Sequence, residues 1–286
     1  MKNLSVAIIV LFSFKAYSQN NPINIKGKIV SEENPIAFVN IGIVGKNIGT
    51  VADESGLFEI TILSEFINEP LRFSCVGFET EEYSVAAFLK SHPTNPVVLK
   101  MREKIMLLEP VVIKYRNSKT VTLGSKSESI KLNAGFPSNK YLGSEIGSKF
   151  NFRGKKGTVA FIEEFSFFVV SNVQDDTVTM RLNIYALDDD KIPTDKLINQ
   201  DIILTIPNKS GWVITDLTPY NIYTTDDFVI ALEWIKYKAK NSRIRFSSTF
   251  PYTGKLYLKI ASHGKWWVPI GGPVSFNVKL SYHEKD

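Results

Sequence analysis

Apolar and polar residues alternate along much of the first hundred residues, and this period of two predicts β-strands. Between residues 23 and 30 the apolar positions share one face and the polar positions share the other. The same alternation recurs at residues 37–43, 58–62, 71–75 and 97–99. About seven short strands of this kind, separated by turn residues, are typical of an antiparallel β-sandwich.

A tight turn at residues 53–56 connects two of these strands, and we expect a hairpin there, with strands at 49–52 and 57–62. The side chains of Asp53 and Ser55 can hydrogen-bond nearby backbone groups. Gly56 can adopt the positive φ that closes such a turn. After the turn, Phe58, Ile60 and Ile62 alternate with polar residues, which predicts a half-buried strand.

The second half of the chain has longer and more aromatic strand patterns. They cover residues 146–152, 159–170, 177–187, 202–206, 212–217, 228–235, 243–248, 255–260 and 274–282. Within 177–187, Arg181, Asn183 and Tyr185 share one face, opposite an apolar face. Residues 193–199 form the only helix-like piece, of about one turn. Eight or nine strands in this span predict a jelly-roll-like β-sandwich over residues 141–286.

Four sequence blocks in the first half occur in an order that resembles a known family. They are Gly27-Lys-Ile-Val, Asn34-Pro-Ile-Ala-Phe-Val-Asn-Ile, Gly49-Thr-Val-Ala-Asp-Glu-Ser-Gly-Leu-Phe and Leu71-Arg-Phe-Ser-Cys-Val-Gly-Phe-Glu-Thr. Together they resemble the carboxypeptidase regulatory-like domain, which also precedes many TonB-dependent receptors of Gram-negative bacteria. The resemblance implies a transthyretin-like sandwich over residues 22–101 that acts as an accessory module, without carboxypeptidase activity.

Between the two predicted domains, residues 102–140 form an expected linker with one extended strand. Residues 105–114 resemble the strand that follows this module in its relatives. Pro110 makes that segment an edge strand, because proline cannot donate to a strand ladder. The second half also resembles the C-terminal part of secreted proteins with the same N-terminal module. Its similarity to carbohydrate-binding jelly rolls is an analogy of fold alone.

Residues 1–18 have the features of a secretory signal peptide and are excluded from the fold. Lys2 is followed by an apolar run at residues 4–14 and by the cleavage pattern Ala16-Tyr17-Ser18. We expect export to the periplasm, the outer membrane or the cell surface, and no transmembrane segment in the mature chain. Loss of Lys2 and Lys15 lowers the formal charge from +5 to +3, which does not indicate binding to nucleic acid.

The residue types that carry catalysis or bind metals form no recognisable motif. The three histidines lie outside metal-binding patterns, and we predict no metal, no cofactor and no catalytic residue. Cys75 is the only cysteine and lies on an apolar strand face, where a small buried side chain is usual. Asp188, Asp189 and Asp190 have the wrong spacing for an EF-hand, so we interpret them as a solvated turn, and calcium binding there stays open.

Three classes of function fit these observations. The first is a non-catalytic accessory or interaction protein of the envelope that recognises another protein. The second is a glycan-binding protein that uses aromatic residues of the C-terminal sandwich, with Trp266 and Trp267 as candidate ligand-binding residues. Because adjacent side chains of a strand point to opposite faces, we expect one of these indoles to be buried and the other exposed. The third is a hydrolase whose carboxylates come from distant strands, for which a buried acid pair in a cleft would be evidence.

Overall fold

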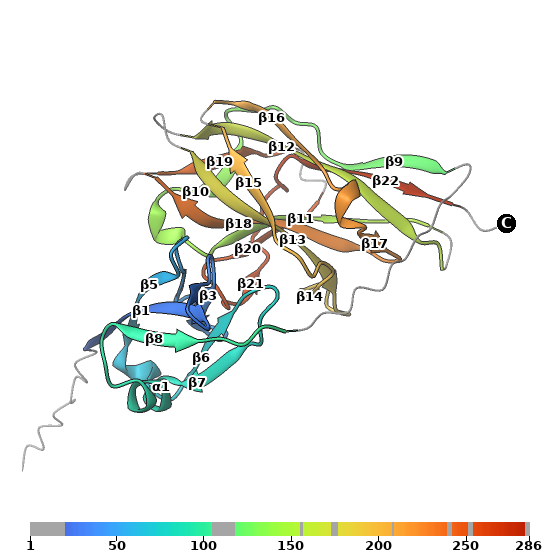
Figure 1. Cartoon of the computed structure of the whole chain (residues 1–286). Helices are drawn as coiled ribbons and strands as arrows, with labels where there is room; N and C mark the ends of the chain where they lie inside the picture. Colours follow the sequence, from blue (N-terminus) through green and yellow to red (C-terminus); the bar gives the residue numbers. More distant parts are fainter. Residues whose placement is uncertain are drawn as a thin grey trace, which may run out of the picture.

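The computed structural model describes residues 21–104, 118–154, 157–172, 177–207, 209–238, 242–250 and 254–283. The described chain is all-β and forms two β-sandwiches that pack against each other (Figure 1). The predicted leader and the strand expected at 105–114 lie outside the described residues. The described residues contain no helix with the length and hydrophobicity needed to cross a membrane.

The N-terminal module consists of two four-stranded sheets. One sheet contains β1 (Pro22–Ser31), β2 (Asn34–Pro35), β5 (Leu57–Leu63) and β8 (Val97–Lys100). The other contains β3 (Asn40–Ile43), β4 (Gly49–Val51), β6 (Pro70–Ser74) and β7 (Glu81–Ser84). The predicted apolar faces meet between the sheets, where Phe58, Ile62 and Phe73 are buried. The burial of these side chains stabilises the sandwich.

One short α-helix, which the strand pattern did not predict, follows β7. Helix α1 (Val85–Ser91) begins after Ser84, whose hydroxyl accepts a hydrogen bond from the Ala87 amide at 3.1 Å. This is a standard N-cap interaction. Val85 and Phe88 bury the inner face of the helix, and the Phe88 ring stacks on Phe73 at 5.2 Å. Three short 3-10 helices lie elsewhere, at η1 (Ser64–Phe66), η2 (Asn139–Tyr141) and η3 (Thr218–Tyr220).

The predicted turn at residues 53–56 is confirmed, but the predicted hairpin is wrong. Asp53 Oδ1 accepts hydrogen bonds from the amides of Ser55 and Leu57 at 2.8 and 2.9 Å, and Gly56 has φ +73°. However, β4 pairs with β3 in one sheet and β5 pairs with β1 in the other. The turn is therefore a corner that carries the chain from one sheet to the other, which local residue chemistry does not reveal.

The C-terminal sandwich consists of two seven-stranded sheets. The β12 sheet contains β9 (Lys119–Gly124), β10 (Asn133–Phe136), β12 (Ala160–Asn172), β16 (Gly211–Asp216), β17 (Tyr223–Thr224), β19 (Ile244–Ser247) and β22 (Phe276–Tyr282). The β18 sheet contains β11 (Glu145–Phe150), β13 (Val178–Leu187), β14 (Pro193–Lys196), β15 (Ile202–Ile206), β18 (Phe228–Tyr237), β20 (Leu256–Lys259) and β21 (Trp266–Trp267). Their shared core is rich in aromatic rings, including Phe165, Phe167, Phe246 and Phe276.

Two local predictions for the second half differ from the structure. Strands β9 and β10 lie inside the expected linker and pair with β22 and β19, so sheet structure begins before residue 141. The sequence of β9 resembles that of a linker, because this strand lies at a sheet edge and is rich in exposed polar residues. The piece at 193–199 contains strand β14 rather than a helical turn, because Pro193 and Lys196 pair with β13.

The corner at Gly56 generates the first prediction. A Cβ atom at this position would lie 2.5 Å from the carbonyl oxygen of Ile29, and φ is +73°. We expect Gly56→Val to destabilise the protein by about 1–3 kcal/mol in chemical denaturation. Ser55→Val is the matched control and should cost less than ~1 kcal/mol, because Ser55 is exposed and has a negative φ. Equal unfolding free energies for the two variants would contradict the assigned corner.

Candidate functional site: a buried row of charges at the domain junction

Four charged residues form one continuous row across the outer face of the β18 sheet. Arg181 of β13 lies opposite Glu233 of β18, and Glu233 lies opposite Glu145 of β11. Glu145 in turn lies opposite Lys259 of β20. In this charged row (Arg181, Glu233, Glu145 and Lys259), two adjacent anions therefore lie between two cations. Directly opposed like charges destabilise a sheet, so the two carboxylates depend on the flanking cations.

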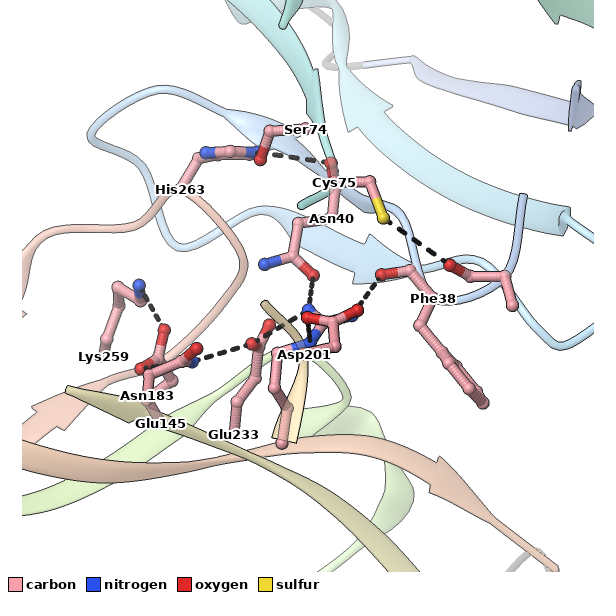
Figure 2. Close-up of polar contacts among 12 residues, drawn as sticks. Phe38, Asn40, Ser74, Cys75, Glu145, Asn183, Asp201, Glu233, Lys259 and His263 are labelled. Carbon is pink, nitrogen blue, oxygen red and sulfur yellow. Dashed lines mark hydrogen bonds and ion pairs between the residues drawn. The ribbon is translucent and has the colours of Figure 1, made fainter. Parts of the chain in front are cut away.

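Arg181 connects the charged row to the N-terminal module. Its side chain is 3% exposed, and Nη1 donates to Glu233 Oε2 at 3.2 Å. The same nitrogen donates to Asn40 Oδ1 at 3.1 Å, and Nη2 donates to the carbonyl oxygen of Phe38 at 2.7 Å. Asp201 forms an ion pair with Nε at 2.9 Å. One guanidinium thus binds both domains. Figure 2 shows Asn40 and Phe38 of the N-terminal module close to Asp201 and Glu233 of the C-terminal sandwich.

The two carboxylates of the charged row have further partners on the same sheet face. The Asn183 amide donates to Glu145 Oε2 at 3.2 Å and to Glu233 Oε2 at 3.0 Å. Tyr185 donates its hydroxyl proton to Glu145, with contacts of 2.9 and 2.8 Å to the two carboxylate oxygens. Lys259 forms an ion pair with Glu145. Buried charges persist only when they are paired and hydrogen-bonded in this way.

Electrostatics keep Glu233 and Arg181 ionised. Burial alone would raise the pKa of Glu233, but the positive charges of Arg181, Lys196 and Lys259 outweigh it and lower that pKa. Burial lowers the pKa of Arg181, and the negative charges of Glu233 and Asp201 reverse that effect, so the net shift is upward. Burial and the Glu145 charge raise the pKa of Tyr185 well above its usual value. Tyr185 therefore stays protonated and serves as a hydrogen-bond donor.

A loop of the C-terminal sandwich, at residues 260–264, forms the second part of the junction. The carbonyl oxygen of His263 accepts a hydrogen bond from the Gly45 amide at 2.8 Å. The His263 ring contacts the carbonyl oxygen of Asn40 at 3.2 Å and the hydroxyl of Ser74 at 3.4 Å. Burial lowers the pKa of His263 to about 4, so the ring is neutral at physiological pH. This loop approaches so closely that a Cβ atom on Gly42 would lie 2.2 Å from the carbonyl oxygen of Ser262.

Two non-glycine residues with positive φ lie at this junction. Phe38 has φ +58° and His263 has φ +62°. Such a conformation is strained for a bulky residue and persists only when surrounding contacts hold it. Each of these residues supplies a carbonyl oxygen to a hydrogen bond across the junction. The interdomain contacts therefore offset the backbone strain on both sides.

The charged row contains the buried acid pair that the hydrolase hypothesis required, but the pair does not face a cleft. Glu145 and Glu233 both have a relative exposure of 0%. Arg181 and Lys259 neutralise them, and the N-terminal module covers the row at Asn40 and Phe38. A substrate would reach these carboxylates only if the domains separated. The arrangement is suited to holding the domains together.

The candidate ligand-binding residues Trp266 and Trp267 are placed differently from each other. Trp266 extends the charged row, because it lies opposite Lys259, and its half-buried ring packs against Tyr185 at 5.3 Å. The ammonium group of Lys259 lies 4.9 Å from the Trp266 ring centroid. Trp267 lies opposite Leu258 and is 56% exposed. The two indoles differ in exposure as expected, but Trp266 is half-buried rather than buried. A binding role stays a prediction.

The remaining sequence candidates have structural roles. Cys75 is partly buried against the N-terminal core, and burial raises the pKa of its thiol to about 11. Asp188 Oδ1 accepts a hydrogen bond from the Ile192 amide at 2.7 Å within an exposed turn between β13 and β14. Across the residues that the structure describes, no group of three or more His, Cys, Asp or Glu side chains is arranged to hold a metal ion.

A hollow of about 470 Å³ opens between the sheets of the C-terminal sandwich, away from the charged row. It lies where the pairing of β11 with β20 ends, at Ser148. Beyond this point, no strand among the described residues pairs with Lys149 and Phe150 on the β20 side. Lys149 forms an ion pair with Asp227 at 2.7 Å, and Phe150 is buried in the core. Lys149, one of the polar residues that line this hollow, thus already has a partner.

Comparison with known proteins identifies the N-terminal module. The family model of the CarboxypepD_reg-like domain matches residues 25–113. The N-terminal module is therefore a carboxypeptidase regulatory-like domain, a class that is regulatory and non-catalytic. No curated protein matches the chain significantly.

Solved structures of infectious bursal disease virus particles share a distant similarity with the chain. The VP2 subviral particle has 10% identity and a TM-score of 0.28, and the match covers 91% of this chain and 64% of that one. The Gx strain structure has 8% identity and a TM-score of 0.29, with coverage of 93% and 61%. The chain thus spans less than two thirds of these viral chains, and scores this low support no argument about fold or function.

The charged row generates the second prediction. We expect Arg181→Met to destabilise the protein by about 3–5 kcal/mol, because it leaves Glu233 buried without its cation. Lys236→Ala is the control, since it removes the exposed interdomain pair with Glu54 and should cost less than ~1 kcal/mol. Urea denaturation measures both.

A double variant separates the loss of charge pairing from the loss of packing. Arg181→Met combined with Glu233→Leu removes both charges and should recover at least half of the lost stability. If Arg181→Met costs no more than Lys236→Ala, the charged row does not hold the domains together.

Proposed function

We propose that this protein is a non-catalytic, exported accessory protein of the bacterial envelope that recognises another envelope protein. The observation that supports this most is that the charged row serves to join the two domains. The charged row is buried, neutralised and committed to the domain junction, where it positions two sandwiches as one unit. The regulatory class of the N-terminal module points in the same direction.

The recognition surface in this proposal is centred on Trp267. This indole is 56% exposed on β21, at the edge of the β18 sheet, close to the domain junction (Figure 1). Ile270, three residues further along, is fully exposed at 105%. Tryptophan is among the residues that are enriched at protein-binding surfaces and in their energetically dominant contacts. The buried side of the same strand is fixed by Trp266, so the surface is presented rigidly.

The proposed export of the protein rests on the leader pattern at residues 1–18. A glycan is the alternative ligand, because an exposed indole also stacks on sugar rings. The two alternatives differ in what Trp267 would contact and can be separated by experiment.

Photo-crosslinking in the envelope of the native host tests the proposal and is the third prediction. A photoreactive amino acid at position 267 should give one discrete protein adduct, because the partner lies against this indole. The matched control is position 98, where Val98 is 57% exposed on the N-terminal module and should give no such adduct. Identical adducts at both positions, or none at either, would contradict the proposal.

The tryptophan variants test the same surface in the purified protein. Trp266→Ala should cost about 2 kcal/mol of stability, because it removes the ring that packs against Tyr185 and Lys259. Trp267→Ala should cost less than ~1 kcal/mol, because Trp267 is 56% exposed. A glycan-array signal that Trp267→Ala abolishes would favour the glycan alternative.

A further inference from the structure

A second hollow lies on the outer face of the β12 sheet, on a different sheet from the charged row and from Trp267. It has a volume of about 260 Å³ and is lined by Lys126, Glu128, Ser166, Trp212, Ile214 and Asn277. We call it the outer-face hollow. No sequence motif indicated it, because its residues come from three strands and from the segment between β9 and β10.

The floor of the outer-face hollow is a row of three side chains in strand register. Ser166 of β12 lies opposite Asn277 of β22 on one side and opposite Ile214 of β16 on the other. Phe165 and Phe167 of β12 point into the core, so Ser166 between them points outward. The row therefore presents an amide, a hydroxyl and an aliphatic group side by side. Ile214 is 64% exposed and available for contact.

Asn277 lacks a hydrogen-bond partner where one is expected. The residue is only 4% exposed, and its Oδ1 atom is buried and accepts no hydrogen bond within the described part of the chain. A buried polar atom without a partner is destabilising. Asn277 is one of the residues that line the outer-face hollow. A ligand with hydroxyl groups would supply the partner that the fold does not.

The walls of the outer-face hollow are held in place by their own contacts. The Trp212 indole packs edge-on against Phe168 at 5.5 Å and donates from Nε1 to Glu128 Oε1 at 2.6 Å. The segment that carries Lys126 and Glu128 is fixed to the sheet, because Ser127 Oγ donates to the carbonyl oxygen of Ser248 at 3.0 Å. The hollow is thus built before any ligand arrives.

The geometry points to a binding subsite for one unit of a neutral saccharide. The lining provides donors and acceptors together, and sugar hydroxyl groups can both donate and accept. Trp212 and Ile214 offer apolar surface for the C–H face of a sugar ring. Lys126 and Glu128 contribute opposite charges, so the hollow carries no net formal charge and favours an uncharged ligand. This subsite does not depend on the proposed protein-binding surface at Trp267.

Calorimetric titration of the full exported protein tests the subsite and is the fourth prediction. The probes are glucose, galactose, mannose and N-acetylglucosamine with their short oligomers. We expect at least one probe to bind saturably, and Ser166→Ala and Ile214→Ala each to weaken it about fivefold to tenfold, the loss of one hydrogen bond or one apolar contact. Both positions are partly or largely exposed, so the melting temperatures of the variants should stay close to that of the wild type.

Two further readouts assign the site. The side-chain amide resonances of Asn277 should shift during the titration, and Trp267→Ala should bind the probe as the wild type does. The inference would be overturned if no probe binds, if binding is unchanged in both Ser166→Ala and Ile214→Ala, or if only Trp267→Ala abolishes it. The last outcome would instead assign glycan binding to the surface at Trp267.

Discussion

The burial of one guanidinium between two β-sandwiches is the constraint on which the rest of the structure depends. Arg181 is 2% exposed and contacts Glu233 on its own sheet and Asn40 and Phe38 on the N-terminal module. A buried arginine is tolerated only when its donors are paired. The N-terminal module must therefore lie where Asn40 and Phe38 can accept hydrogen bonds from Arg181. Apolar contacts alone would specify its position less precisely.

The charged row explains how two glutamates can lie opposite each other inside the protein. Glu145 and Glu233 would repel each other if they were alone, but Lys259 and Arg181 flank them, and Asn183 donates to both. Replacing such a network with apolar side chains can be neutral for stability, so its use here is consistent with specificity of domain placement. The same row ends at Trp266, and the rigid junction therefore also positions the exposed Trp267.

Much of the fold could be predicted because it depends on local patterns. The period of two placed Phe58, Ile60 and Ile62 in the core, and Gly56 has the positive φ that its turn required. Strand geometry also separated Trp266 from Trp267. By contrast, Ser84 begins a helix through a capping hydrogen bond that a strand pattern does not reveal, although serine before an apolar run was a usable signal. Edge strand β9 was missed because exposed edge positions are as polar as a linker.

The candidate site could be predicted only in part, because it depends on pairing between distant strands. The sequence placed Arg181, Asn183 and Tyr185 on one face, but alternation does not show what covers that face. Glu145 and Glu233 meet only through the register of β11 and β18. Likewise, Asn277, Ser166 and Ile214 come together from three strands. Single residues of these sets carry no motif, so only the assembled sheets reveal them.

We infer that the charged row makes the two sandwiches one cooperative unit. Scanning calorimetry of the protein at neutral pH measures this cooperativity. We expect one transition whose calorimetric and van't Hoff enthalpies agree. Unfolding of the N-terminal module would uncover the buried charged row, and unfolding of the C-terminal sandwich would remove Arg181 from Asn40 and Phe38. Two separate transitions, with the N-terminal module melting independently of the C-terminal sandwich, would contradict it.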